Sequence, residues 1–305
     1  MPLLKRSFTQ LRPRNRQKRR HVTDKYFAGI DVGSTMTKVI VVGDSGIVSS
    51  VIGPTGAEHR RLANRVMEEA VTKAGLGFED ISYVISTGYG RVNVPFADKQ
   101  TTEISCHAKG VADIFPEAKT IIDIGGQDSK GIKIKAGKVR DFVMNDKCAA
   151  GTGRFLEAIA ETLGLGLEDL GPISLKAKQA LRVSNTCTVF AEQEVVARAA
   201  EGAKLEDIVA GIHEAMATRI LAMVERVKIE KDVVITGGGA KNVGLVAAME
   251  KGLGFTALLP PEPLITGALG AAILAREKFE KAGLKGDLPE RATRHLDEAT
   301  FFDNG

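Results

Sequence analysis

Two stretches decide the fold: Ile30-Asp-Val-Gly-Ser-Thr-Met-Thr-Lys38 and Ile122-Asp-Ile-Gly-Gly-Gln-Asp-Ser-Lys130. They align without gaps, and Ile, Asp, Gly and Lys recur at matching positions. Apolar runs flank each stretch, which predicts a strand, a small hydroxyl-rich turn and a second strand. A motif that recurs between similar flanks is typical of an internal duplication. We therefore predict two α/β lobes, each of which opens with a β-hairpin that carries Asp-x-Gly at its tip.

The residue types at both hairpin tips suit a nucleoside triphosphate. Asp31 and Asp123 occupy matching positions and could hold a hydrated Mg²⁺ ion, which prefers a few carboxylates together with water and phosphate. Backbone N–H groups and small hydroxyl or amide side chains can donate hydrogen bonds to phosphate oxygens. The candidate donors are Gly33, Ser34, Thr35 and Thr37 in the first hairpin, and Gly125, Gly126 and Gln127 in the second.

A third glycine-rich turn follows the apolar run at 233–235. It reads Thr236-Gly-Gly-Gly-Ala240, so Gly237, Gly238 and Gly239 are further candidates for phosphate contacts. The alternative for this turn alone is a tight connection between a strand and a helix. The sequence has no Gly-x4-Gly-Lys-Ser/Thr loop, so we do not expect a P-loop ATPase.

The rest of the chain predicts alternating strands and helices. Apolar runs predict strands at 47–52 and 81–86, a loop is expected at 87–91, and helical spacing predicts helices at 62–74, 205–227 and 244–251. Further helices are expected to begin near Ala191 and Gly267. We expect four segments: a basic tail at 1–22, a first lobe at 23–118, a second lobe at 119–265, and a C-terminal helix with a polar tail at 266–305.

The composition is ordinary for a globular protein, but the charge is unevenly distributed. The 305 residues are 44% hydrophobic and 26% charged, with a net charge of +4. Residues 1–22 hold eight basic residues and no acid, so the rest of the chain is acidic. We interpret this tail as a solubilising extension; the alternatives are contact with nucleic acid, a membrane surface or an acidic partner.

The sequence offers no apolar run of membrane-spanning length. No apolar segment follows the basic residues near the N-terminus either, which argues against a secretory signal. We therefore expect a cytoplasmic protein, with no role at a membrane and no nucleic-acid partner.

Three cysteines, Cys106, Cys148 and Cys187, cannot form an even disulfide framework, so thiolate chemistry or metal ligation fits better. Cys148 lies in a glycine-containing turn within Asn145–Glu157, directly ahead of helical spacing, and Cys187 precedes a second predicted helix. A helix N-terminus stabilises a thiolate or an anionic cluster bound by thiolates. The alternative for Cys148 is a buried thiol beside a turn. We expect Cys106 to be structural, although the neighbouring His107 hints at a metal ligand.

Together these motifs resemble one family within the superfamily of acetate and sugar kinases, heat-shock chaperones and actin. That family comprises the ATP-dependent activators of 2-hydroxyacyl-CoA dehydratases and the ATPase subunits of benzoyl-CoA reductases. The resemblance implies an α/β fold with two duplicated actin- and ribonuclease-H-like lobes and an ATP cleft between them. It covers about residues 26–275 and is carried by Gly29–Thr35, Asp123–Lys130, Met144–Leu156, Cys187–Glu192 and Thr236–Gly239.

The resemblance also implies the cofactors ATP, Mg²⁺ and a [4Fe-4S] cluster shared between two subunits. Cys148 and Cys187 match the cluster ligands, and two subunits together would complete the four thiolates. We expect Asp31, Asp123 and Gln127 to act on the metal and the attacking water. Lys38 and Lys130 could reach phosphates.

The implied function is ATP-driven electron transfer. ATP binding and hydrolysis would move the lobes and pass a low-potential electron to a partner CoA-thioester dehydratase or reductase. A donor such as ferredoxin would supply the electron, and the chain would form a homodimer or a heterodimer with a similar ATPase subunit. The segments Pro261–Gly267 and Phe190–Glu194 favour the benzoyl-CoA reductase type.

Two functions from other classes stay open at this point. A small-molecule kinase of the same superfamily would keep the ATP motifs but gives no reason for Cys148 and Cys187. A nucleotide-dependent assembly protein of the actin or chaperone type would also keep the hairpins and would hold no iron.

Overall fold

The first of two β-sheets contains the first Asp-x-Gly hairpin. The computed structural model describes residues 25–183, 187–285 and 296. The central strand β1 runs antiparallel to β2 and parallel to β4, in the order β3-β2-β1-β4-β5. The strands are β1 (Tyr26–Val32), β2 (Met36–Gly43), β3 (Gly46–Pro54), β4 (Ile81–Thr87) and β5 (Lys99–Gln100).

The second sheet repeats this topology. Its central strand β6 runs antiparallel to β7 and parallel to β9, in the order β8-β7-β6-β9. Asp31 pairs with Lys38 across the first hairpin, and Asp123 pairs with Lys130 across the second. The predicted duplication is therefore confirmed for four strands of each sheet, and β5 has no counterpart in the second sheet. The strands are β6 (Thr120–Ile124), β7 (Ser129–Lys135), β8 (Lys138–Asn145) and β9 (Val233–Thr236).

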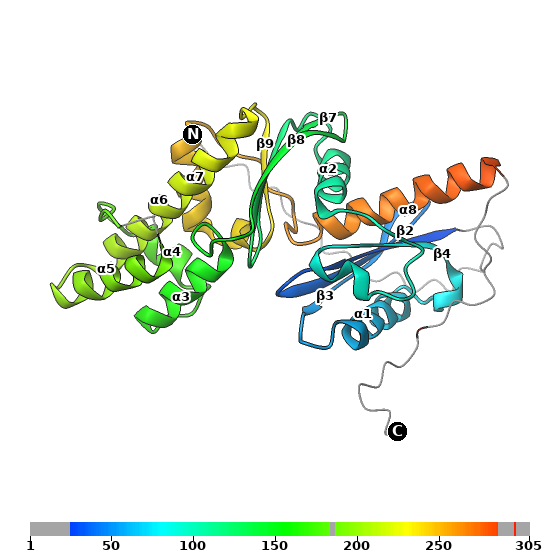
Figure 1. The fold of residues 1–305 in the computed structure, drawn as a ribbon, viewed down its shortest axis with the longest axis horizontal. Helices are drawn as coiled ribbons and strands as arrows, with labels where there is room; N and C mark the ends of the chain where they lie inside the picture. The colour runs from blue at the N-terminus through cyan, green and yellow to red at the C-terminus, as the bar shows by residue number, and fades with distance from the viewer. Residues whose placement is uncertain (1–24, 184–186, 286–295, 297–305) are drawn as a thin grey trace, which may run out of the picture.

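Helices α1 (His59–Lys73) and α8 (Thr266–Lys285) cover opposite faces of the first sheet (Figure 1). Side chains alternate along a strand, so Ala28 and Ile30 of β1 pack in the core with α1, whereas Phe27 packs with α8. The last helix thus returns to the first sheet. We call this sheet with its two helices the first lobe. The boundaries at residues 119 and 266 stay predictions.

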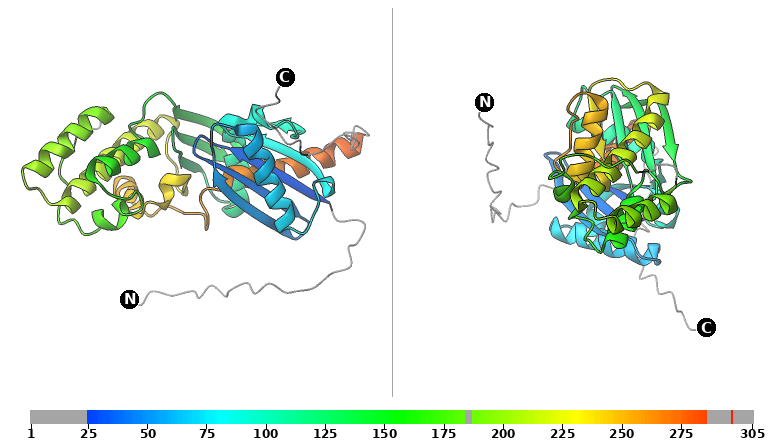
Figure 2. Two further views of the ribbon diagram at one scale, coloured as in Figure 1. Left: turned by 90° about the horizontal axis from the view of Figure 1, so that it is seen from below. Right: turned by 90° about the vertical axis from the view of Figure 1, so that its left-hand side faces the viewer.

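The second lobe is the other sheet with helices packed against it. Helix α6 (Leu205–Val224) is the centre of its larger core, and α2 (Glu103–Ile114) covers the opposite face of the sheet. From another direction, α3–α7 gather at one end of the molecule, with α1 and α8 at the other (Figure 2). The remaining helices are α3 (Gly153–Leu163), α4 (Leu170–Ser174), α5 (Thr188–Ala200) and α7 (Val243–Leu253).

Two local predictions need correction. Helix α5 begins at Thr188 rather than near Ala191, so Cys187 is its N-cap residue. Residues 87–91 are not a simple loop, because a 3-10 helix, η2, occupies Tyr89–Asn93. The basic tail at 1–22 and the polar tail after Lys285, apart from residue 296, lie outside the described residues. In the part of the chain that the structure describes, no helix has the length and apolar character needed to cross a membrane.

Helix α8 packs directly on the backbone of β1 because Gly29 has no side chain. A Cβ atom at Gly29 would meet the carbonyl oxygen of Ala268 and the amide nitrogen of Ala272. Two similar contacts join α2 to α8: a Cβ at Gly110 would meet Thr266, and one at Gly270 would meet Cys106. Backbone cannot move aside as a flexible side chain can, so these glycines fix where the helices lie.

We expect Gly29→Ala to lower the free energy of unfolding by about 2 kcal/mol or more, because overpacking forces the backbone apart. Chemical denaturation would measure this loss. Gly53→Ala in β3 is the matched control, since its Cβ would lie 3.5 Å from the Val66 side chain, an ordinary contact. Equal losses in the two variants would contradict close packing of α8 on β1.

Candidate functional site

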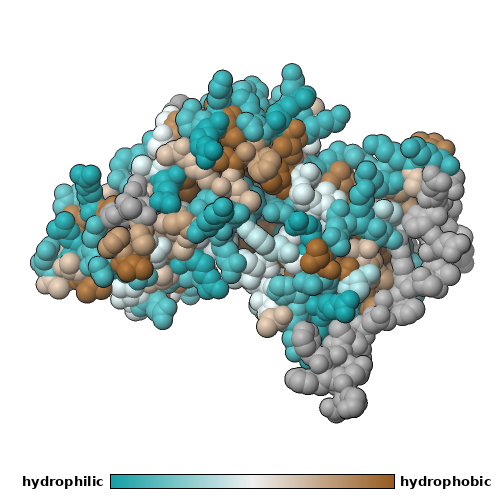
Figure 3. Space-filling model, in the orientation of Figure 1, coloured by the Kyte–Doolittle hydropathy of each residue, from teal (hydrophilic) through white to brown (hydrophobic). Residues whose placement is uncertain are grey.

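One cleft of about 440 Å³ lies between the lobes and brings most of the predicted site residues together. On the face shown in Figure 3, the surface where the lobes meet is mostly pale or hydrophilic. Both hairpins, the Thr236–Ala240 turn and the start of α3 line the cleft. The predicted residues in its lining are Asp31, Gly33, Ser34, Thr35, Lys38, Asp123, Gly125, Gly126, Lys130, Gly237, Gly238 and Gly239.

The two hairpin tips face each other across the cleft. A Cβ atom at Gly126 would meet the Thr35 hydroxyl oxygen and would lie 3.4 Å from that of Ser34. Both tips fold alike: the N–H of Gly33 donates to the carbonyl of Met36, and that of Gly125 to the carbonyl of Asp128. Backbone and hydroxyl donors from both lobes therefore converge on one place.

A second repeated element supports each hairpin. Gly88 follows β4 and Gly237 follows β9, with φ angles of +83° and +80°. These angles favour glycine. A Cβ at Gly88 would meet the carboxylate of Asp31, and one at Gly237 would lie 2.9 Å from Oδ1 of Asp123. The repeated Thr-Gly pair at 87–88 and 236–237 was the signal for this equivalence, which the interpretation of 87–91 as a loop missed.

Each hairpin aspartate forms a buried ion pair with the lysine opposite it. Lys38 Nζ lies 3.1 Å from Asp31 Oδ2, and Lys130 Nζ lies 3.5 Å from Asp123 Oδ2. Lys130 is also 2.6 Å from Oδ2 of Asp128. Burial alone would lower the pKa of Lys130, but the two carboxylates raise it, so the ammonium stays charged. Both lysines, predicted to reach phosphates, already neutralise carboxylates in this structure.

Asp123 is held as an anion. Burial would raise its pKa, but the electrostatic interactions with His107 and Lys130 outweigh burial and lower the pKa to about 2. The Thr236 hydroxyl also donates to Oδ1 at 2.9 Å. A carboxyl group with a lowered pKa stabilises the fold above its ordinary pKa of 3.8, and this contribution is lost as the pH falls through about 2.

His107 is a cleft residue that the sequence flagged only as a possible metal ligand. Its Nε2 lies 3.7 Å from Asp123 Oδ2, and its Nδ1 is 2.9 Å from the Thr266 hydroxyl. It therefore contacts residues of β6 and α8 at the base of the cleft. The neighbouring Cys106 is fully buried, and burial raises the pKa of its thiol to about 12, which fits a structural role.

Two predicted residues do not line the cleft. Thr37 is fully buried, and its hydroxyl is hydrogen-bonded to that of Thr55 at 2.9 Å, so the arrangement does not support a phosphate contact. Gln127 is exposed at the second tip. Asp128 lines the cleft and was missed because the repeat aligns it with Met36, an apolar residue.

One part of the cleft lining that the hairpins do not build is apolar, and we call it the apolar end of the cleft. Its wall is built from α3, the 167–172 segment, the start of α7 and the loop before α8. The apolar lining residues there are Leu156, Leu167, Pro172, Val243 and Leu264. One end of the cleft thus suits phosphates, and the other suits an aromatic base.

The first N–H groups of α3 bond to the second hairpin tip and not to the side chain of Cys148. The N–H groups of Gly153 and Arg154 donate to the carbonyls of Gly125 and Gly126 at 2.8 and 2.9 Å. The prediction that these helix N–H groups serve an anion at Cys148 needs correction, because the hairpin tip uses them. Cys148 instead lies in the turn that precedes the helix.

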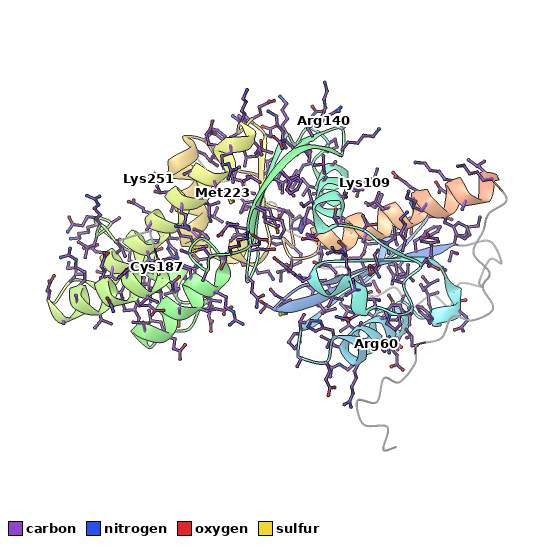
Figure 4. All side chains as sticks on the ribbon, viewed as in Figure 1. Arg60, Lys109, Arg140, Cys187, Met223 and Lys251 are labelled. Carbon is purple, nitrogen blue, oxygen red and sulfur yellow. The ribbon has the colours of Figure 1, made fainter. Side chains whose placement is uncertain are left out.

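Cys148 and Cys187 both lie in the second lobe and are partly exposed. The Asn145 side chain holds the Cys148 turn, donating to the carbonyls of Cys148 and Ala150 at 2.9 and 3.1 Å. Cys187, labelled in Figure 4, is the N-cap residue of α5. Its side chain takes no part in a capping hydrogen bond. Helices α3 and α5, which follow the two cysteines, pack together.

This arrangement defines a class of protein. Two lobes with duplicated β-hairpins around one polar cleft are the architecture of actin-like ATPases, so the predicted fold class is confirmed. A model of the BadF/BadG/BcrA/BcrD ATPase family matches residues 28–275, and the chain belongs to this family.

The chain aligns with its relatives over nearly the whole length of each relative. The chain is 45% identical to the 2-hydroxyisocaproyl-CoA dehydratase activator of Clostridioides difficile, with 84% of this chain and 97% of the relative covered. The crystal structure of (R)-2-hydroxyglutaryl-CoA dehydratase component A from Acidaminococcus fermentans matches with a TM-score of 0.80 and 44% identity, covering 83% and 98%. A benzoyl-CoA reductase subunit of Thauera aromatica is 31% identical, with 85% and 96% covered.

We expect Lys130→Met to lower the free energy of unfolding by about 3–5 kcal/mol, because it leaves two buried carboxylates without their ammonium group. Lys133→Met on the same strand is the control: Lys133 pairs with the exposed Glu230, so its loss should destabilise the fold far less. Urea denaturation of both variants would measure the difference. Similar losses would show that the Lys130 pairs are not desolvated.

Proposed function

We propose that this chain is the ATP-hydrolysing, electron-donating activator of a 2-hydroxyacyl-CoA dehydratase. The observation that carries the proposal is the position of α3. The first N–H groups of this helix bond to the Gly125–Gly126 tip in the cleft, and the Cys148 turn directly precedes it. A nucleotide site and a thiol site thus share one structural element.

The cleft supports a nucleotide in a definite orientation. We place the phosphates between the hairpin tips and the base at the apolar end near Val243. Asp31 and Asp123 would hold Mg²⁺, because their carboxylates are anionic oxygen donors of the kind this ion prefers. Bound there, Mg²⁺ would supply charge stabilisation for phosphoryl transfer. Lys38 and Lys130 would then exchange part of their carboxylate contacts for phosphate contacts.

The cysteines fit half of a [4Fe-4S] site. Cys148 and Cys187 are partly exposed thiols on neighbouring segments, in contrast to the buried Cys106. The N-terminus of α5 favours negative charge at Cys187. Two copies of the chain would supply four thiolates, which supports a dimer around one shared cluster. Bound there, the cluster would supply one-electron chemistry.

The coupling between the sites would be conformational. ATP can drive a change only if it binds two lobe arrangements with different affinity. When the two hairpin tips approach each other across the cleft, both can donate hydrogen bonds to one triphosphate. Closure of the cleft would therefore favour nucleotide binding. The dimer and an electron donor such as a ferredoxin belong to the same proposal.

The comparisons favour the dehydratase activators over the other candidates. Relatives with that name are 44–45% identical to the chain, against 31% for the benzoyl-CoA reductase subunit. The preference drawn from Pro261–Gly267 and Phe190–Glu194 is therefore not supported. The small-molecule kinase is also disfavoured, because the relatives at 44–45% identity are dehydratase activators.

We expect about two irons per chain, with matching acid-labile sulfide, after anaerobic purification. Cys148→Ser and Cys187→Ser should each lose the iron, because each removes two of the four thiolates in a dimer. Cys106→Ala is the control and should keep it. If wild-type protein purified without exposure to oxygen contains no iron, the proposed cluster is wrong and only the proposed ATPase activity remains.

We expect Asp123→Asn to lower kcat for ATP hydrolysis by about 100-fold or more, since it removes a charge from the proposed metal site. The asparagine can still accept the hydrogen bond from Thr236, which limits structural damage. Asp141→Asn, an exposed change on β8, is the control and should leave kcat unchanged. Full activity in Asp123→Asn would place the metal elsewhere.

A further inference from the structure

The apolar end of the cleft is backed by a buried histidine. His213 of α6 is only 1% exposed. Its Nδ1 lies 2.9 Å from the Ser174 hydroxyl of α4, and its Nε2 lies 3.1 Å from the side-chain amide nitrogen of Asn242, the N-cap residue of α7. The ring itself does not line the cleft, but it bonds to both helices that flank this end.

The surrounding hydrogen bonds determine which atom donates and which accepts in each of the two contacts of His213. The side-chain oxygen of Asn242 accepts from the N–H groups of Gly244 and Leu245, so its NH2 group faces His213 and Nε2 must accept. The Ser174 hydroxyl donates to the carbonyl of Gly171, so it must accept from the N–H at Nδ1. Burial lowers the pKa of His213 to about 4, in agreement with a neutral ring.

The same contacts fix part of the cleft wall. Asn242 and Val243 line the cleft, as does Pro172 next to Gly171. The first turn of α7 lies directly against the histidine, because Gly244 has no side chain: a Cβ there would lie 2.7 Å from Nδ1 of His213 and would collide with the Ser174 hydroxyl. A change at His213 therefore reaches the wall through Asn242.

We propose that His213 is a positioning residue for the nucleoside end of the nucleotide cleft, acting through its Nε2 contact with Asn242. This inference rests on the nucleotide site proposed above. The phosphate end is built from the hairpins, whereas the ring of His213 is hydrogen-bonded to Ser174 and Asn242 at the other end. Loss of the contact with Asn242 should therefore weaken nucleotide binding and leave the hydrolytic step nearly unchanged.

Two substitutions of similar polarity separate this role from simple packing. Glutamine places an acceptor oxygen near the position of Nε2, so His213→Gln can keep the bond from Asn242. Asparagine reaches only to the position of Nδ1, so His213→Asn keeps a donor to Ser174 and loses Asn242. If His213 serves only in packing, the two variants should weaken nucleotide binding equally. Alternatively, His213→Asn, which has the smaller side chain, should lower stability more and leave binding unchanged.

The experiment measures binding of a nonhydrolysable ATP analogue by calorimetry, and kcat and KM for ATP, in the full chain. We expect His213→Asn to weaken binding and raise KM about tenfold, the effect of one buried hydrogen bond. His213→Gln should stay within about threefold of wild type by the same measure. The value of kcat should change little in either variant.

Two further variants keep the test decisive if a histidine variant does not fold. Asn242→Ser retains an N-cap oxygen for α7 but lacks the amide donor, so it should weaken binding as His213→Asn does. Ser174→Ala removes the other contact of the ring and should leave binding within about threefold of wild type. Thr218→Ala, exposed on the same helix, is the control.

Equal weakening by His213→Gln and His213→Asn would overturn the inference, as would unchanged binding in both with lowered melting temperatures. Weakening by Ser174→Ala as large as that by Asn242→Ser would also overturn it. Failure of the wild-type chain to bind the analogue is a separate result, which would overturn the proposed nucleotide site.

Discussion

The structure depends on two buried carboxylates that are each paired with a lysine. Asp31 and Asp123 each lie opposite a lysine in a β-hairpin, and each lysine is desolvated with its partner. Charges of this kind are tolerated only when they are paired and hydrogen-bonded. The strand register, the Thr-Gly turn after the parallel strand and the tight hairpin tip all serve that pairing, and they occur twice. The cleft exists because both lobes present this arrangement to each other.

The duplicated fold could be predicted because its signal is local. Aspartate, glycine and lysine recur at fixed spacing in sequence, and register then brings each aspartate to its lysine. Contacts between distant segments could not be predicted in this way. Asp128 was missed because its counterpart is Met36, and the bonds from α3 to the second tip depend on tertiary packing. The bonds that surround His213 join α4, α6 and α7, and no spacing in the sequence indicates them.

The second lobe serves more than one purpose with the same helices. Helix α3 bonds to the hairpin tip at its first residues and packs against α5, which begins after Cys187. Helix α6 fills the core of that lobe and also supports the apolar wall of the cleft. The wall of the cleft and the segment of Cys148 are therefore parts of one packed body. Packed interiors transmit displacement because they have little free volume.

The return of α8 to the first sheet has a mechanical consequence. The chain passes from the first lobe to the second just before α2 and comes back just before α8, and these two helices touch through Gly110 and Gly270. Two adjacent crossings define an axis, and rotation about that axis is the motion that stretches neither connection. The displacement of any atom in such a rotation grows with its distance from the axis. Cys187 lies in the part of the second lobe farther from α2 than the strands of its sheet (Figure 4). A small rotation that closes the hairpin tips would thus move Cys187 farther than it moves the tips themselves.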